Sequence, residues 1–249
     1  MYRFLLGPRW IGFHLLVVGA IVTMVNLGFW QLRRLDERQA FNATVEARYD
    51  LPPVAFDGVV DELGADDLGT AQTADLEWRT VEVSGTYLPD ETVFVVNRSQ
   101  GGRAGRNVVV PLLLDDGRIL VVNRGFVPLA EDPPAIPSET GTRVDLVGRV
   151  RTSQERGLGQ LADPTEGDLV EIQRIDLDRL APQLPGELVP FYVDLVSSSP
   201  PEASPYPESV AAPELGEGNH LAYAVQWFVF STAVAVGWVL AVRRSLASR

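Results

Sequence analysis

The chain of 249 residues contains no cysteine, no lysine and only two histidines, His14 and His220. The lack of cysteine excludes disulfides, thiolate metal sites and thiol redox chemistry. Both histidines belong to apolar segments near the chain ends, so the long middle region has no histidine for acid–base or nucleophilic catalysis. We therefore expect that the protein is not an enzyme.

Charge is missing from two long runs, because residues 10–32 and 221–242 contain no Asp, Glu or Arg. A helix needs about 20 apolar residues to cross about 30 Å of hydrocarbon. The runs predict two transmembrane helices, at residues 10–32 and 220–242. A cleaved signal peptide is the alternative for the first run, but its apolar core would span about 7 to 15 residues before small cleavage-site residues. We expect an uncleaved anchor.

Basic residues near a membrane span favour the cytoplasmic side. Arg243, Arg244 and Arg249 follow the second run, whereas the twenty residues before it carry four glutamates and no base. The pattern predicts that both termini are cytoplasmic and the central domain is extracytoplasmic, although several arginines also follow the first run. Residues 39–219 carry 13 basic and 31 acidic residues. So acidic a region is not expected to bind nucleic acid.

Short runs rich in Val, Thr and aromatic residues, separated by turn signals, predict a β-rich, barrel-like extracytoplasmic domain at residues 39–196. Antiparallel strands are expected across residues 78–151, with a hairpin at the "DDG" of residues 115–117. A further strand is expected at 187–196, and one short helix within 168–184, where Pro182 ends it.

Two acidic stretches are poor in core residues: 57–75, and 197–219 with its several prolines. The second stretch predicts an extended tether that leads back to the membrane. The carboxylate pairs Asp66–Asp67 and Asp115–Asp116 lie in turn-like sequence, where Asp is common because it hydrogen-bonds the local backbone. We interpret these pairs as turn residues rather than as a metal site.

Polar residues inside membrane segments are costly and often functional. His220, Tyr223 and Trp227 are spaced i, i+3 and i+7 and share one face of the second helix. These residue types suit a haem, with His220 as the axial ligand of the iron. The alternative is an aromatic belt at the membrane interface, with His220 as a polar cap. His14 lies about 27 Å from the outer end of its helix, too far to share an iron with His220 in one copy.

Four strings in order resemble the SURF1 (Surfeit locus protein 1, Shy1-like) family of cytochrome c oxidase assembly factors: "LGFWQLRRLDER", "VEVSGTYL", "PLLLDDGRILVVNRGFVP" and "NHLAYAVQWFVF". Two terminal helices around a β-rich domain match the same pattern. The chain departs from it at Phe126, where the family usually has tryptophan, and at Arg38, where lysine is common.

The resemblance implies a membrane protein that binds haem a and assists its insertion into the catalytic subunit of an aa3-type haem-copper oxidase. It implies that His220 is the iron ligand and that Trp30, Gln31 and Arg34 also belong to the cofactor site. Tyr223 and Trp227 would line the haem. Because the first apolar run begins within ten residues of the start, without room for a transit peptide, we expect a multi-pass protein of a bacterial plasma membrane.

The alternative function is a scaffold that holds an immature oxidase subunit without haem, or stays in the respiratory complex as an accessory subunit. In either case the expected partners are the oxidase catalytic subunit, other assembly or haem-synthesis proteins, and membrane lipid. Haem bound by one copy and haem held between two copies of a homo-oligomer both stay open.

Overall fold

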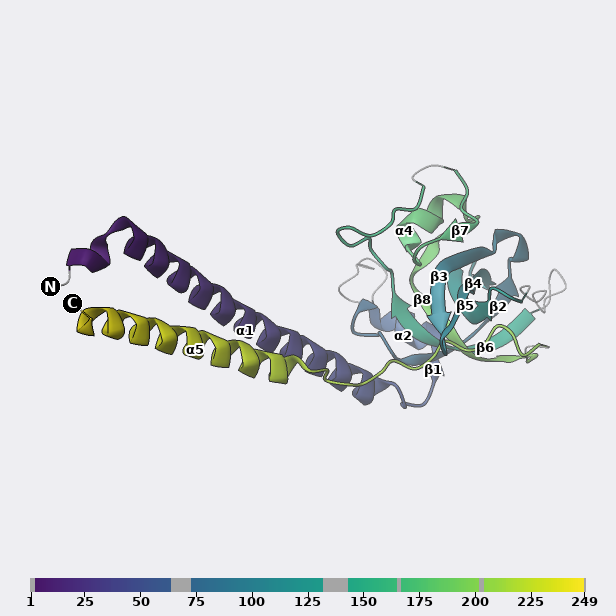
Figure 1. The fold of residues 1–249 in the computed structure, drawn as a ribbon. Coiled ribbons are helices and arrows are strands. Elements are labelled where there is room, and N and C mark those ends of the chain that lie inside the picture. The colour runs from purple at the N-terminus through teal and green to yellow at the C-terminus, as the bar shows by residue number, and fades with distance from the viewer. Residues whose placement is uncertain (1–2, 64–72, 132–142, 165–166, 202–203, 249) are drawn as a thin grey trace. The chain divides into compact units, whose positions relative to one another are not determined.

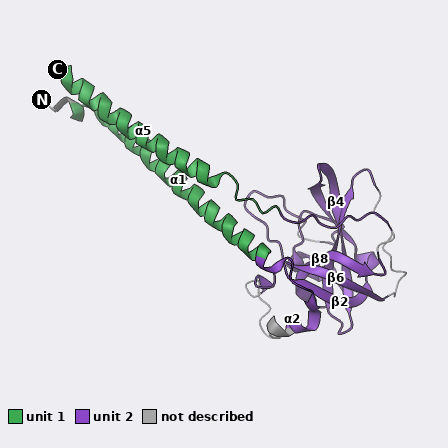
Figure 2. Cartoon of the chain, turned by 90° about the horizontal axis from the view of Figure 1, so that it is seen from below, with its two compact units in different colours: residues 1–46, 214–249 green, residues 47–213 purple. Residues whose placement is uncertain are grey.

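The computed structural model describes residues 3–63, 73–131, 143–164, 167–201 and 204–248. The chain divides into two compact units (Figure 2). The first, the helical unit, comprises residues 1–46 and 214–249, and the second, the β-rich unit, comprises residues 47–213.

The helical unit is built from two long helices, α1 (Pro8–Arg48) and α5 (His220–Ala247), after a short 3-10 turn, η1 (Arg3–Leu6). The helices are antiparallel, because Gln31 of α1 bonds to the start of α5 while His14 bonds to Trp238 near its end. The start of α1 and the end of α5 therefore lie at the same end of this unit (Figure 1).

The helices contact each other through a small residue. Gly28 is buried against Phe228, and a Cβ added at Gly28 would lie 2.7 Å from that ring. Such close helix contacts through small residues are typical of membrane helices.

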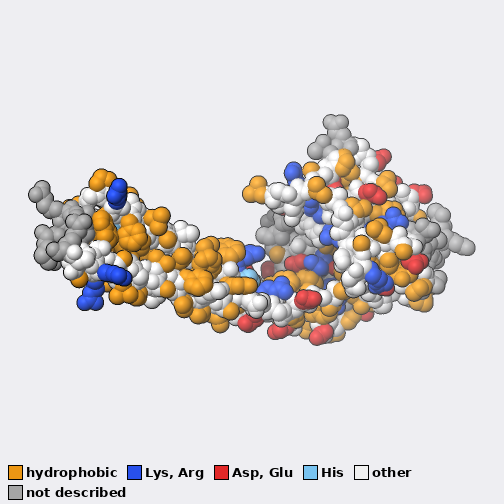
Figure 3. All heavy atoms as spheres, in the orientation of Figure 1, with side chains coloured by type: hydrophobic (Ala, Val, Ile, Leu, Met, Phe, Trp, Pro, Cys, Tyr) orange, Lys and Arg blue, Asp and Glu red, His pale blue; other side chains and the backbone are white. Residues whose placement is uncertain are grey.

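The helical unit exposes most of its apolar side chains. Only 11% of the most apolar 18-residue window of α1 and 6% of that of α5 is buried. Apolar side chains cover the surface of these helices, whereas acidic and basic side chains are frequent on the β-rich unit (Figure 3). Water is a poor solvent for so much apolar surface. Two such helices are consistent with a membrane protein.

Helix α1 does not end near residue 32 but continues to Arg48, past residue 39, where the sequence analysis places the start of the domain. Its extension pairs with residues 214–217. The side chains of Arg38, Gln39 and Asn42 bond to that segment. These three residues fall on one helical face with Gln31, at spacings of seven, eight and eleven. The polar extension is therefore stabilised by contacts from the other end of the chain.

The β-rich unit contains one mixed sheet. Its longer strands are β2 (Thr80–Tyr87), β3 (Val93–Gln100), β4 (Arg103–Leu114), β5 (Ile119–Pro128), β6 (Arg143–Thr152) and β8 (Leu188–Ser199), and its two-residue strands are β1 (Val54–Ala55) and β7 (Glu171–Ile172). Strands pair in the order β1-β2-β6-β8-β5-β4-β3-β7. A further pairing between β2 and β4 closes five of them, β2, β6, β8, β5 and β4, into a ring.

The six longer strands lie where the hydrophobic runs predict them. The hairpin at residues 115–117 is present between β4 and β5, and Gly117 has the positive φ, 88°, that the turn requires. Strand β8 is antiparallel to β6 but parallel to β5, so the sheet is mixed rather than antiparallel throughout.

The helical segments of the β-rich unit are short. They are α2 (Phe56–Leu63), η2 (Pro89–Glu91), α4 (Leu177–Leu180) and η3 (Ala181–Gln183). The helix expected across 168–184 is reduced to α4 and η3, because Ile172 joins strand β7 and the side chain of Asp176 caps α4. Helix α2 occupies the start of the stretch 57–75, and its Phe56 and Val59 are core residues.

Two groups of buried side chains stabilise the β-rich unit. The larger one includes Phe191, Leu112 and Val122 inside the ring, and the smaller one packs Ile172 and Tyr192 under α4. The stretch expected to be a tether is partly attached to the sheet, because Glu208 and Phe126 exchange two backbone hydrogen bonds of 2.8 Å and Tyr206 packs against the larger core.

Candidate functional site

The candidate site lies in the helical unit, where α5 begins. Nδ1 of His220 lies 2.8 Å from Oε1 of Gln31, a residue 189 positions earlier in the chain. His220 is half-buried between these helices. Of the six residues predicted for the cofactor, these two are joined by a hydrogen bond between their side chains within the described part of the chain.

The partner of Nδ1 determines which nitrogen of His220 can bind a metal. An amide oxygen only accepts, so Nδ1 carries the hydrogen and donates it to Gln31. The neutral imidazole then has its lone pair on Nε2. A second hydrogen bond of this kind orients metal-binding histidines and makes them better ligands. The pair Gln31–His220 therefore presents Nε2 in the form that an iron requires.

The backbone before α5 leaves space beside this ring. Gly218 has a φ of 68°, a conformation that glycine adopts without strain. A Cβ at this position would lie 3.3 Å from Cδ2 and 3.4 Å from Nε2 of His220. Glycine therefore keeps a side chain away from the nitrogen that would bind the iron.

The aromatic residues predicted for the site lie on the surface of the helices. Trp30 is 46% exposed and Tyr223 is 50% exposed. Trp227 is half-buried and meets Phe230 edge to face, with ring centroids 6.2 Å apart. Such exposed rings are available to a planar apolar ligand or to lipid, and both interpretations made from the sequence stay open.

Arg34 does not contact His220. Its guanidinium forms an ion pair of 2.7 Å with Glu37, and both side chains are more than half exposed. An exposed pair of this kind contributes little stability and separates easily. Glu37 is therefore the partner of Arg34 in this structure, and a carboxylate ligand would have to replace it.

The second histidine is in a different chemical state. The indole Nε1–H of Trp238 donates to Nδ1 of His14 at 2.8 Å, so the lone pair on Nδ1 is used. The neutral ring then carries its hydrogen on Nε2, which is a donor rather than a ligand. Trp10 and Phe13 also pack against His14. His14 is therefore a helix-packing residue, and His220 is the candidate ligand.

The start of α5 is held by residues that were not predicted from the sequence. Arg38 donates to the carbonyl oxygens of Gly216 and Glu214, and Gln39 donates to the carboxylate of Glu217 at 3.0 Å. Asn42 is buried and lies 3.4 Å from the carbonyl oxygen of Leu215. The recurrence of polar residues at positions 31, 38 and 42 is a helical signal that could have indicated this face.

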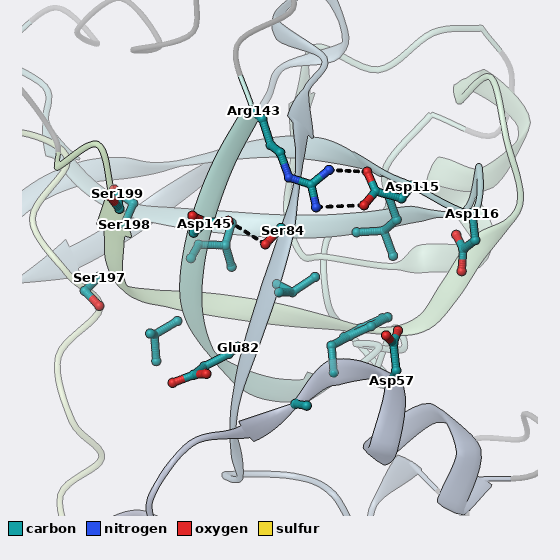
Figure 4. A pocket seen from close by; sticks show the side chains of 16 residues that line it. Asp57, Glu82, Ser84, Asp115, Asp116, Arg143, Asp145, Ser197, Ser198 and Ser199 are labelled. Atoms are coloured by element: carbon teal, nitrogen blue, oxygen red, sulfur yellow. Dashed lines mark hydrogen bonds and ion pairs between the residues drawn. The ribbon is translucent and has the colours of Figure 1, made fainter.

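The β-rich unit has an acidic depression of about 680 Å3 (Figure 4). Arg143 pairs with Asp115 and lowers the pKa of that carboxyl, and Arg118 lowers the pKa of Asp116 in the same way. Asp116 also accepts from the backbone N–H of Arg118, as the turn interpretation predicts. The described residues contain no group of three side chains that could hold a metal ion. Asp66 and Asp67 lie outside them.

A buried polar cluster lies at the junction of β5, β6 and β8. Asp194 accepts hydrogen bonds from Asn123 at 2.7 Å and from Arg151 at 3.2 Å. Burial raises the pKa of Asp194, and the nearby Arg151 opposes that rise. Burial also raises the pKa of Tyr192, whose hydroxyl accepts from Gln154. No local sequence pattern indicates this cluster, because its members come from separate strands.

The sequence is similar to known proteins of one family. The sequence profile described as the SURF1 family matches residues 18–232. An uncharacterized SURF1-like protein of Mycobacterium tuberculosis is 26% identical over 238 residues, which cover 94% of this chain and 83% of the relative. SURF1-like proteins of Monosiga brevicollis and Rickettsia bellii are 26% and 24% identical, over 94% of this chain and 88% and 92% of their own lengths.

Proposed function

The chain belongs to the SURF1 family, whose members are generally cytochrome oxidase assembly factors, and from that premise we propose that it binds haem a and assists its insertion into an aa3-type cytochrome c oxidase. Haem a is the cargo in this proposal rather than a resident cofactor. The proposed partners are the oxidase catalytic subunit and the proteins that synthesise or deliver the haem. The protein carries out no chemistry on the haem and is not an enzyme.

The observation that supports this proposal is the hydrogen bond between Gln31 and His220. It leaves Nε2 as a neutral nitrogen ligand, and Gly218 keeps the adjacent space open. A single histidine supplies one axial bond, so the opposite face of the iron stays available to a receiving protein. Trp30, Tyr223 and Trp227 then pack against the ring, and Arg34 pairs with a propionate after leaving Glu37.

The proposed location is a bacterial plasma membrane, with α1 and α5 as its two spans. Both termini are cytoplasmic in this proposal, and the β-rich unit is extracytoplasmic. His220 then lies at the outer boundary of the hydrocarbon. Arginines 243 and 244 follow the apolar part of α5, as cytoplasmic residues do in membrane proteins.

The proposal is tested by purifying the full-length protein from a host that makes haem A. We expect a haem spectrum in the wild-type protein and in His14→Ala, and its loss in His220→Ala. The two variants are matched, because the chain has no other histidine. Haem retained in His220→Ala, with unchanged absorption maxima, would refute the assignment of the ligand.

A scaffold without haem is the second candidate, and one observation favours it. A groove of about 710 Å3 runs along α5 between Val225 and Leu240, lined by apolar and small side chains. Such a surface suits a transmembrane helix of an immature oxidase subunit. On this account His220→Ala leaves oxidase activity in cells near normal, whereas Gly237→Leu, which fills the groove, reduces it. The haem carrier predicts that His220→Ala itself reduces oxidase activity.

A further inference from the structure

A second cavity lies within the β-rich unit, and none of the residues proposed to bind haem lines it. Its volume is about 220 Å3, and its walls come from β6, β8 and residues 209–213. Two arginines of β6 line it, each stacked on an aromatic ring. The guanidinium carbon of Arg149 lies 3.5 Å from the ring centre of Tyr49, and that of Arg151 lies 3.9 Å from the ring centre of Trp78.

The two arginines differ in their partners. Arg151 pairs with Glu77 at 3.3 Å and with Asp194 at 3.2 Å. Arg149 has no carboxylate within 4 Å of its nitrogen atoms among the described residues, and its Nε is buried without a hydrogen-bond acceptor. A buried charged donor without an acceptor is costly to leave in a folded protein. The Nε–H of Arg149 is therefore a donor that a bound anion would satisfy.

Asp194 does not complete the site. It attracts Arg149 electrostatically, but its side-chain hydrogen bonds come from Asn123 and Arg151. The carboxylate of Asp194 is therefore bonded to Asn123 and Arg151, and the hydrogen-bond donors of Arg149 are left to a ligand.

The walls of the cavity are fixed in place. Trp78 has a φ of 74°, which is strained for a bulky residue. Its backbone N–H donates to the carbonyl oxygen of Val150 at 3.0 Å. Gln100 holds the opposite wall, because it donates to the carbonyl of Ser209 and accepts from the N–H of Ala211, both at 3.1 Å. Stacking holds the guanidinium of Arg149 by its face and leaves its N–H edges for an acceptor. The cavity is thus preorganised.

We propose that this cavity binds an oxyanion, a phosphate or a carboxylate, and that Arg149 is the residue that holds it. A guanidinium binds either group through two parallel hydrogen bonds. The oxyanion has two possible sources: a small anion free in solution, or the headgroup of a phospholipid. Arg48, the last residue of α1, lies 16 residues or about 24 Å along the helix beyond the apolar run that ends at residue 32, so a small anion in solution is the favoured source and a headgroup is the alternative to be tested. This proposal does not depend on haem binding.

The test measures Tm for the full-length protein in nonionic detergent. Inorganic phosphate and acetate are the probes, and sodium chloride at equal ionic strength is the reference. A ligand at 100 times its Kd stabilises enough to raise Tm by about 5 to 10 °C in a protein of this size. We expect this rise with one or both probes in the wild type and its loss in Arg149→Gln.

Two further variants test whether the response depends on this particular arginine and on its guanidinium group. Arg143→Gln removes an exposed arginine that pairs with Asp115 outside this cavity, and it should keep the full response. Arg149→Lys keeps the charge but not the planar fork, and its affinity should fall about tenfold. An equal response in Arg149→Gln and Arg149→Lys, or no difference between the probes and chloride in the wild type, would overturn the proposal.

Lipid nanodiscs distinguish the two sources. If a headgroup fills the cavity, added phosphate and acetate no longer raise Tm in nanodiscs, although they do so in detergent. If the ligand is a free anion, the rise persists in both. In either case the response must disappear in Arg149→Gln.

Discussion

At the scale of single residues, the two histidines show how a neighbouring side chain determines which nitrogen of an imidazole carries the hydrogen. Gln31 accepts a hydrogen from Nδ1 of His220, whereas Trp238 donates one to Nδ1 of His14. The first arrangement places the lone pair on Nε2, and the second places a hydrogen there. Two identical side chains in one helical unit thus differ in the nitrogen that carries the free lone pair, and His220 has it on Nε2, the atom that we propose as the iron ligand.

The role of Gln31 can be tested by removing its acceptor oxygen. Gln31→Leu should weaken haem A binding by about 10- to 100-fold, because a partner of this kind typically contributes that much to metal affinity. Gln31→Glu, which keeps an acceptor, should retain most of the affinity. The matched control is Gln226→Leu, an exposed amide on α5. Titration of haem A into the apoprotein, followed by absorption, measures these affinities. Equal affinities for Gln31→Leu and Gln226→Leu would contradict the assigned role.

The buried carboxyl of Asp194 predicts a pH dependence of stability. Because burial raises the pKa of Asp194 in the folded protein, its contribution is fully present below the pKa of the unfolded chain. The contribution is lost as pH rises through the folded pKa. The Tm of the wild type should therefore fall relative to that of Asp194→Asn as pH increases from about 4 to neutrality.

Comparison of the two proteins at each pH cancels the titration of other groups. Asp115 and Asp116, whose pKa values are lowered, act in the opposite sense but are present in both proteins. A Tm difference that does not change with pH would show that Asp194 does not titrate in this way.

At the scale of elements, strand β5 depends on close contact with the segment after β8. Gly125 has a φ of 129°, and a Cβ there would lie 2.1 Å from the carbonyl oxygen of Glu208. Gly125→Ala should cost about 2 kcal/mol or more of unfolding free energy, because it combines backbone strain with a clash against the backbone.

Gly117→Ala is the matched control for this effect. Gly117 also has a positive φ, but no atom lies within 4 Å of an added Cβ. Gly117→Ala should lower the free energy of unfolding by about 1 kcal/mol. Chemical denaturation measures the free energy of unfolding of both variants. Equal losses of this free energy would show that the close approach of Gly125 to Glu208 does not contribute to the effect.

The elements also show what the sequence could predict. The strands and the hairpin at Gly117 follow from local alternation and turn residues, which need no knowledge of distant segments. The pairing of β2 with β4 and the parallel pairing of β5 with β8 join strands that are not neighbours in sequence, so no local pattern predicts them.

The candidate site was predictable in the same limited sense. Helical spacing placed His220, Tyr223 and Trp227 on one face, and the family resemblance indicated Gln31. Neither source predicted that Gln31 accepts from Nδ1 across 189 residues, or that Arg34 pairs with Glu37. Cavity walls such as Tyr49 and Arg149 also come from distant segments, and they carry no local motif.

At the scale of the whole molecule, the proposed topology can be tested directly because the chain lacks cysteine. Leu158→Cys places one thiol on a fully exposed residue of the β-rich unit, and Ser248→Cys places one after α5. In intact bacterial cells without an outer-membrane barrier, an impermeant maleimide should label the first variant. It should label the second only after the membrane is permeabilised. The reverse pattern would invert the topology.

The central claim is that Nε2 of His220 binds the haem iron, and pulsed electron paramagnetic resonance of the ferric haem A complex tests it most directly. Protein made with 15N-histidine contains two labelled imidazoles, those of His14 and His220. We predict hyperfine coupling between the unpaired electron of the ferric iron and the 15N nuclei of one imidazole. His14→Ala should preserve this coupling and His220→Ala should abolish it. Bound haem without histidine coupling, or coupling that survives in His220→Ala, would contradict the claim.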